Sequence, residues 1–194
     1  ELIERASGGD SEAFEQIMIY SQRKVMLTTW RILGNEEDAR DAVQEVFLRV
    51  YKYLRTFKRE QDFLGWLYRI IVNVCRDMER KRRIHKDQIT SLESEIEAGT
   101  LQYPVDSRDT ERETEEAALL IQRRRLITRA IVSLPVKERT AIVLRDLEGF
   151  STEEVARIMG SSPNTVRVQI SSARSKIRHY CHHLLKGKEA SKEL

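Results

Sequence analysis

The sequence contains unusually little glycine and proline. Of its 194 residues, 8 are glycine and 3 are proline, which is about half the combined frequency of an average protein. β-Sandwiches and β-barrels need many tight turns, and these two residues supply most of them. The scarcity argues against such folds and favours an all-α fold. Hydrophobic residues make up 40% of the chain, enough for one or two small cores.

Cysteines and long apolar runs are also scarce. The two cysteines, Cys75 and Cys181, are too few for a disulfide framework and favour a reducing compartment. No apolar run approaches the roughly 18 residues that would suggest a membrane span. The sequence begins at Glu1 without a charged and then apolar leader. We therefore expect a cytoplasmic protein with no membrane insertion of its own.

Charge is distributed in blocks, although the net charge is only +3. Five lysines and arginines and no acid fall between Arg80 and Lys86. Residues 93–116 contain nine acids against two arginines, a net charge of −7, and residues 157–194 have a net charge of +6. The acidic segment has few large apolar residues, which is typical of a linker. We predict two helical domains at 1–90 and 117–186, an acidic linker at 91–116 and a disordered tail at 187–194.

Apolar residues of the N-terminal domain recur with helical spacing. Asn35 or Asp38 can cap one helix. Its buried stripe would comprise Ala39, Ala42, Val43, Val46, Phe47, Val50, Tyr51 and Leu54. A second long helix is predicted from about Phe63 to Arg83. Its inner face would comprise Leu67, Ile70, Ile71, Val74 and Met78.

The C-terminal domain carries clear signals for where its helices start and stop. One helix is expected at about 115–133 and another at 135–147, with a proline in its first turn. Ser151 and Glu154 form a capping box that starts a further helix. After a tight turn, Ser162 caps the next helix, which begins with Pro163. Two helices joined by so short a turn are typical of a helix-turn-helix. The alternative is a helical hairpin with a solvated basic face.

The second helix of this pair carries the residue types that read DNA. Arg167 and Gln169 are the candidate base-reading residues, because arginine pairs bidentately with guanine and glutamine with adenine. Arg174, Lys176 and Arg178 are better suited to binding phosphates. The N-terminal residues of such a helix lie against base edges in the major groove.

Aromatic and basic residues gather near the start of the second long helix of the N-terminal domain. Four of the thirteen aromatic residues fall within twelve positions, namely Phe57, Phe63, Trp66 and Tyr68, with Lys58, Arg59 and Arg69 among them. Aromatic faces stack on unpaired bases while cations hold the backbone. The cluster therefore predicts binding of single-stranded DNA. The alternative is that the aromatic residues belong to the core and the basic residues are merely solvated.

No pattern of catalytic residues is evident. The sequence has no Walker loop, no Ser/His/Asp set and no two-metal carboxylate cluster, so we expect no enzyme activity, no metal and no cofactor. His179 and His183, four residues apart on a helix, could bind zinc with Cys181 or His182 nearby. A frayed basic helix end explains the same residues without a metal.

Taken in order, several motifs resemble bacterial sigma factors of the extracytoplasmic-function type, a small two-domain class. Residues 38–47, DARDAVQEVF, resemble the family's segment that binds core polymerase, and residues 66–73, WLYRIIVN, resemble its promoter-melting segment. Leu134-Pro135, residues 144–151 (LRDLEGFS) and Thr165-Val166-Arg167 follow in the family's order. The resemblance covers nearly the whole chain outside the linker. It implies a region 2 helical bundle and a region 4 helix-turn-helix.

The resemblance implies roles for three sets of residues. The set that would bind the clamp coiled coil of the polymerase β′ subunit is Asp41, Gln44, Glu45 and Leu48. The set that would contact and melt the −10 element is Phe57, Lys58, Phe63, Trp66, Tyr68, Arg69, Asn73 and Arg80. The set that would read the −35 element is Asn164, Thr165, Arg167, Val168, Gln169, Ser171, Ser172 and Arg174. Spacing supports the first set, because its members lie on one helical face outside the buried stripe.

The function that the resemblance implies is that of an alternative sigma factor. Such a protein binds core RNA polymerase through the β′ clamp coiled coil and the β flap, and it directs initiation at promoter DNA. An anti-sigma factor is a further expected partner. Two other classes fit parts of the sequence. One is a two-domain helix-turn-helix regulator that binds DNA without polymerase, and the other is a helical DNA-processing enzyme.

Overall fold

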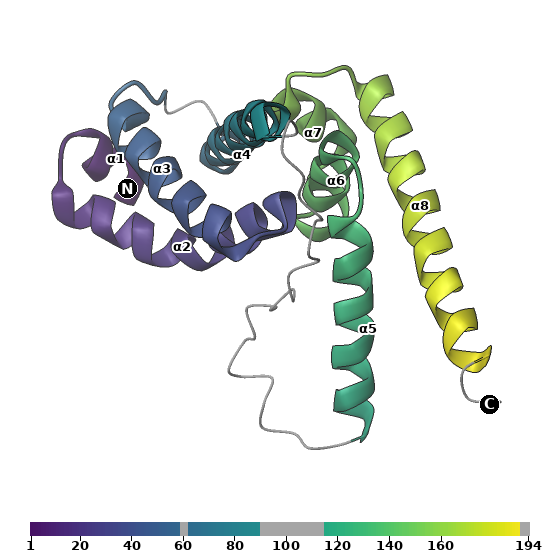
Figure 1. Cartoon of the computed structure of the whole chain (residues 1–194). Coiled ribbons are helices and arrows are strands. Elements are labelled where there is room, and N and C mark those ends of the chain that lie inside the picture. Colours follow the sequence, from purple (N-terminus) through teal and green to yellow (C-terminus); the bar gives the residue numbers. More distant parts are fainter. Residues whose placement is uncertain (59–61, 90–114, 191–194) are drawn as a thin grey trace. The chain divides into compact units, whose positions relative to one another are not determined.

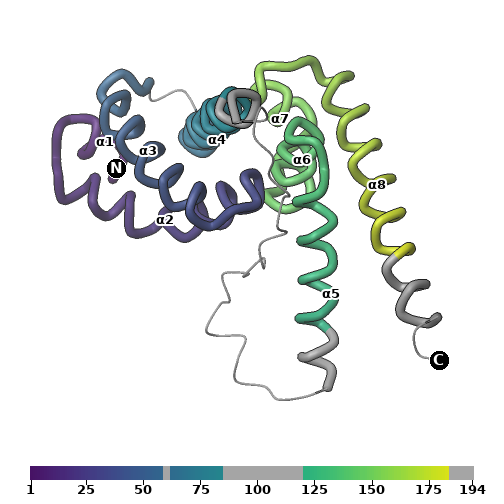
Figure 2. The backbone as a smooth tube through the Cα atoms, in the orientation of Figure 1, coloured from purple at the N-terminus to yellow at the C-terminus, as the bar shows by residue number. Residues whose placement is uncertain are grey.

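The computed structural model describes the backbone of residues 1–58, 62–89 and 115–190 and the side chains of residues 1–58, 62–84 and 120–183. All regular structure in these residues is helical, which confirms the expected all-α fold (Figures 1 and 2). The chain divides into two compact units, the first mainly from the N-terminal half with Arg157–Gly160 added, and the second from the rest of the C-terminal half. The predicted linker at 91–116 lies outside the described residues, except for its last two positions. None of the described helices is long and apolar enough to cross a bilayer.

The helices of the first unit form a bundle. α1 spans Leu2–Ser7, α2 spans Ser11–Leu33, α3 spans Glu36–Leu54 and α4 spans Phe63–Ile89. α2 packs against α1, α3 and α4, and α3 also packs against α4 (Figure 1). The side chains of Trp30, Leu54, Tyr68 and Ile71 are among the largest that are completely buried.

The start of α3 follows the sequence signal. The side chain of Asn35 accepts a hydrogen bond from the backbone N–H of Asp38 at 3.0 Å, so Asn35 is the cap of this helix. Gly34, with a φ of 74°, ends α2 in the left-handed region that glycine tolerates best. Two adjacent residues therefore fix the turn between α2 and α3, because Gly34 ends the first helix and Asn35 caps the second.

The buried faces of α3 and α4 differ from the predicted stripes in two respects. Tyr51 is 62% exposed, and its ring only meets the edge of Phe14 with centroids 5.1 Å apart. On α4, Tyr68, Val72 and Cys75 are buried in addition to most of the expected face. These three residues adjoin the predicted stripe, and the packing of α4 against α2 and α3 covers them as well.

The second unit is built around its long last helix. α5 spans Glu115–Val132, α6 spans Val136–Ile142, a single turn of π-helix η2 spans Val143–Leu147, α7 spans Thr152–Met159 and α8 spans Pro163–Ala190. α8 packs against α6 and runs beside α5 (Figure 2). Leu134, Ile142 and Ala173 form a core cluster. The tail predicted to be disordered at 187–194 is helical as far as Ala190.

The helix-turn-helix signals are confirmed atom by atom. The backbone N–H of Ser151 donates to Glu154 Oε2 at 2.7 Å, and the N–H of Glu154 donates to Ser151 Oγ at 3.2 Å, which completes the capping box. Ser162 Oγ accepts from the N–H of Thr165 at 3.1 Å. Gly160 has a φ of 63° in the turn between α7 and α8. The geometry of the turn therefore follows from local sequence.

We expect Asn35→Ala to lower the free energy of unfolding by about 1 kcal/mol, because the N–H of Asp38 loses its acceptor. Asn35→Asp keeps an acceptor and should retain most of the stability. Urea unfolding followed by circular dichroism measures both variants. An alanine variant with an unchanged unfolding midpoint would contradict this role of Asn35.

Candidate functional site

The outer face of α3 combines acidic, polar and apolar residues. Asp41 and Gln44 are exposed, Glu45 is half-buried, and Leu48 is 65% exposed. All four predicted polymerase-binding residues thus lie on the same side of one helix. A large aliphatic side chain held in water among polar neighbours marks a surface suited to a partner.

An ion-pair network fixes one flank of this face. Arg49 donates from Nε to Glu45 Oε1 at 2.6 Å and from Nη1 to Asp77 Oδ2 on α4 at 3.0 Å. These hydrogen bonds and charges raise the pKa of Arg49. A groove of about 460 Å³ lies alongside, lined by Asp38, Asp41, Glu45, Arg49, Val74, Asp77, Met78, Lys81 and Arg82. The charged face is therefore anchored across two helices.

The aromatic cluster is partly core and partly surface. The rings of Phe57, Phe63 and Trp66 lie with centroids 5.2 to 5.6 Å apart. All three are half-buried and pack against the cluster that contains Leu54 and Ala13. The three rings are therefore neither fully buried nor fully exposed, and their contact with unpaired bases stays a prediction.

A helix N-cap that the sequence analysis did not predict fixes the start of α4. Asp62 accepts hydrogen bonds from the N–H of Leu64 at 3.1 Å and of Gly65 at 2.8 Å. A Cβ on Gly65 would lie 2.9 Å from Asp62 Oδ2, so glycine leaves room for this carboxylate. The signal was present as Asp-X-X-Gly before an apolar run. It orients the turn that carries Trp66.

Tyr68 does not occupy the surface position that the sequence suggested. Its side chain is completely buried, with the ammonium group of Lys24 on α2 5.7 Å from the ring centroid. The cause is that α4 packs against both α2 and α3, and the contact with Lys24 places Tyr68 on the side that meets α2. Tyr68 therefore presents no ring face to a base, and it belongs to the core.

The remaining polar residues of the second set lie on the surface. Lys58, Arg69 and Asn73 are exposed, and Arg69 and Asn73 are one helical turn apart on α4. Arg80 is exposed, with its Nη2 3.7 Å from Asp77 Oδ1. Residues 59–61, which include Arg59, lie outside the described residues.

The first turns of α8 present the exposed part of the third set. Asn164, Thr165, Arg167, Val168 and Ser171 are exposed, and Val168 retains 68% of its accessible surface. Arg167 donates to Asn164 Oδ1 at 2.8 Å and to Glu153 Oε1 on α7 at 3.1 Å. The guanidinium is thereby held at the amino end of the helix, with N–H groups still available for a base.

Two other members of the third set form hydrogen bonds with carboxylates from elsewhere in the second unit. Ser172 donates to Glu138 on α6 at 3.1 Å. Arg174 donates to both carboxylate oxygens of Asp146, at 2.7 and 3.0 Å. Gln169 is half-buried, and its Oε1 accepts no hydrogen bond from the described residues. The carboxylates that pair with α8 were not identified from the sequence, because they lie 28 and 34 residues away.

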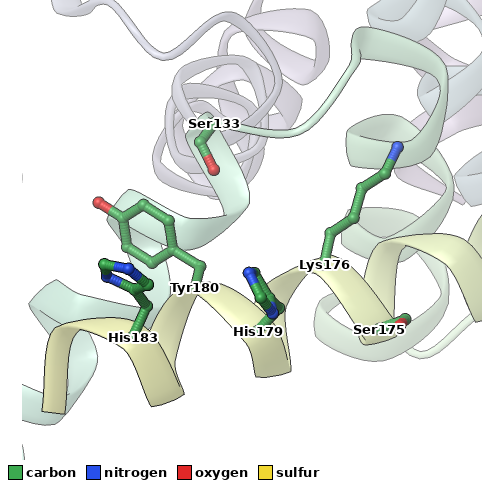
Figure 3. A pocket seen from close by; sticks show the side chains of 6 residues that line it. All are labelled: Ser133, Ser175, Lys176, His179, Tyr180 and His183. Atoms are coloured by element: carbon green, nitrogen blue, oxygen red, sulfur yellow. The ribbon is translucent and has the colours of Figure 1, made fainter. Parts of the chain in front are cut away.

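The histidine cluster near the end of α8 lines a pocket of about 500 Å³ with Ser133, Ser175, Lys176 and Tyr180 (Figure 3). The rings of His179 and His183 have centroids 6.4 Å apart. Burial raises the pKa of the Cys181 thiol, which disfavours the thiolate that a metal would need. Among the residues with described side chains, no three His, Cys, Asp or Glu residues are placed to hold a metal ion.

A helical bundle with an acidic and apolar face, together with a capped helix-turn-helix, is the architecture expected of a transcription factor of the sigma class. Residues 19–84 match Sigma-70 region 2, and residues 124–177 match Sigma-70 region 4. The chain belongs to the sigma-70 family, among its extracytoplasmic-function members.

Individual relatives agree with this assignment. The ECF RNA polymerase sigma-E factor of Escherichia coli K12 is 35% identical over 179 residues, which cover 91% of this chain and 90% of the relative. The RNA polymerase sigma-H factor of Pseudomonas aeruginosa is 32% identical over 180 residues, with the same coverage. The fold resembles that of the sigma factor RpoE in its complex with the anti-sigma factor NepR from Bartonella quintana. That match has a TM-score of 0.67 and 20% identity, and covers 86% of this chain and 95% of RpoE.

We expect Tyr68→Ala to lower the free energy of unfolding by about 3 to 5 kcal/mol, as truncation of a buried aromatic side chain does. Asn73→Ala, on the exposed side of the same helix, should change it by less than about 0.5 kcal/mol. Urea unfolding of both variants measures the difference. Similar stabilities for the two variants would place Tyr68 on the surface after all.

Proposed function

We propose that this chain is an alternative sigma factor, which binds core RNA polymerase and directs initiation at a subset of promoters by reading their −35 and −10 elements. It has no active site of its own and supplies promoter recognition and help in melting to the polymerase. The observation that carries the proposal is that one chain joins a region 2 bundle, with half-buried aromatic and exposed basic residues, to a region 4 helix-turn-helix.

The first contact of this function is with the polymerase. The outer face of α3 offers Leu48 as an apolar centre, with Asp41, Gln44 and Glu45 around it. Burying the side chain of one leucine on binding contributes about 1.5 to 3 kcal/mol. The acidic residues favour a partner with a basic surface. The clamp coiled coil of the β′ subunit is the expected partner. The β flap is the partner expected for the second unit.

The second contact is with the −10 element. Phe63 and Trp66 at the start of α4, and Phe57 in the loop before it, each retain some exposed area. Arg69 and Asn73 follow on α4. A partly exposed aromatic ring can stack on an unpaired base for about 1 to 3 kcal/mol. These residues would capture bases of the opened strand, while Lys58 and Arg80 hold its backbone.

The third contact is with the −35 element. α8 enters the major groove with its amino-terminal residues at base edges, as in other helix-turn-helix proteins. Arg167, already oriented by Asn164 and Glu153, is suited to a guanine. The exposed apolar side chain of Val168 is suited to the methyl group of a thymine.

An anti-sigma factor is a further proposed partner. Support comes from the fold, which is similar to that of a sigma factor bound to the anti-sigma factor NepR. Such a partner would hold the chain inactive until it is released, and it would act on the surfaces that otherwise bind polymerase and DNA.

Run-off transcription with purified core RNA polymerase and a library of genomic fragments tests the proposal. We expect specific transcripts only when this chain is added, and no specific DNA retention by the chain without polymerase. Transcripts that are absent across the library would refute the proposed function. Tight promoter binding by the chain alone would favour a helix-turn-helix regulator instead.

We expect Leu48→Glu to reduce the affinity for core polymerase by at least tenfold, because the variant loses the apolar centre of the proposed face and gains a charge. That factor corresponds to about 1.4 kcal/mol. Ile19→Glu on α2 is the matched control, since Ile19 is 58% exposed on another helix. Fluorescence titration of labelled chain with core enzyme measures both. Equal losses in the two variants would contradict the assignment of this face.

A further inference from the structure

The basic residues of α8 differ sharply in what they already bind. Arg174 donates to both oxygens of Asp146 in η2, at 2.7 and 3.0 Å. Lys176 lies 2.7 and 2.8 Å from the two oxygens of Glu138 in α6. Arg178 is exposed and makes no hydrogen bond or ion pair with any residue that the structure describes. The charge pattern of the sequence treats these three residues alike, and the structure separates them.

Arg174 and Asp146 form a bidentate ion pair, whose geometry suits a structural role. Two parallel hydrogen bonds fix both the direction and the plane of a guanidinium, which a single ion pair does not. The hydrogen bonds to Asp146 and its charge raise the pKa of Arg174. Because Asp146 lies in the turn that joins α6 to the helix-turn-helix, the pair ties α8 to the preceding helix of the same unit. A DNA phosphate near Arg174 would also meet the negative charge of Asp146.

A groove beside this pair concentrates positive charge. It has a volume of about 510 Å³, and every charged residue that lines it is an arginine. The lining residues are Arg145, Thr152, Arg167, Ile170, Ser171, Arg174, Ser175 and Arg178. Arg145 donates to the backbone carbonyl of Phe150 at 3.2 Å, and Arg167 and Arg174 have the acceptors already described. Arg178 is thus the groove arginine with no such partner in the described part of the chain.

The position of Arg178 along α8 suits a contact with the DNA backbone. It follows Arg167 by eleven residues, or about 16 Å at 1.5 Å per residue. The major groove is about 12 Å wide. If Arg167 lies at a base edge, Arg178 reaches the rim of the major groove, where the phosphates are. Arg174, about 10 Å from Arg167 along the helix axis, remains inside the major groove.

We propose that Arg174 is a positioning residue that seats the recognition helix through Asp146, and that Arg178 in the same groove contacts a backbone phosphate of the −35 element. The inference rests on the proposed function and divides the work among residues that the sequence pattern grouped together. It predicts that the two arginines respond differently to salt, because only a phosphate contact releases counterions from DNA.

The test measures holoenzyme binding to a promoter recovered by the run-off experiment, as a function of salt concentration. Arg178→Gln should reduce the slope of log K against log salt by about 0.9, so that its loss of affinity grows about eightfold for each tenfold dilution of salt. Arg174→Gln should weaken binding without changing the slope. Arg123→Gln, an exposed arginine on α5 outside the groove, is the matched control and should leave both quantities unchanged.

Asp146→Asn separates a positioning role from a phosphate contact. It should weaken binding like Arg174→Gln, with an unchanged slope, and the double variant should be no weaker than either single one. Arg174→Lys, which keeps the charge and loses the two parallel bonds, should behave like Arg174→Gln. Thermal unfolding confirms that each variant is folded at the assay temperature.

Specific outcomes overturn the inference. A slope that falls by about 0.9 in Arg174→Gln, or tighter binding by Asp146→Asn, would show that Arg174 contacts phosphate and that Asp146 competes with DNA. An unchanged slope in Arg178→Gln would remove its phosphate contact. Failure of the unaltered holoenzyme to yield any promoter would instead refute the proposed function, so the two failures are distinguishable.

Discussion

Both units depend on one constraint, which is that a helix buries only the part of its circumference that neighbouring helices cover. α3 leaves Asp41, Gln44 and Leu48 in water beside its buried stripe, and α4 leaves Arg69 and Asn73 in water beside its own. On α8 the same limit leaves Val168 exposed opposite the buried side chain of Ala173. Side chains that helix packing leaves exposed are the ones available to partners. The same helices therefore build the cores and present the candidate binding surfaces.

The contribution of a basic residue to DNA binding depends on whether a carboxylate of the same chain already pairs with it, and not only on the number of basic residues. The second unit carries many basic residues, yet Arg174 and Lys176 are each held by a carboxylate from another helix. Exposed single ion pairs contribute little to stability, but a bidentate arginine pair adds geometric definition. Such pairs decide which cations remain to attract DNA. A net charge of +3 for the whole chain therefore says little about DNA binding.

Local signals in the sequence located the starts of α3, α7 and α8. The capping box of Ser151 and Glu154 and the cap at Asn35 depend on residues three apart, and both appear as expected. Properties that depend on distant residues were not accessible. The burial of Tyr68 depends on the packing of α4 against α2 and α3, and the carboxylate that pairs with Arg174 lies 28 residues away. DNA binding was indicated by the residue types of the helix-turn-helix and of the aromatic cluster, whereas the assignment to polymerase came from the resemblance to a family.

The central claim is that one chain binds polymerase through α3 and the −35 element through α8. Site-specific photocrosslinking in a reconstituted promoter complex tests it most directly, with the crosslinker placed at Leu48 or at Val168, both of which are well exposed. We expect the probe at position 48 to crosslink to the β′ subunit and the probe at position 168 to crosslink to −35 DNA. Crosslinks from position 48 to DNA, or from position 168 only to polymerase, would contradict this account.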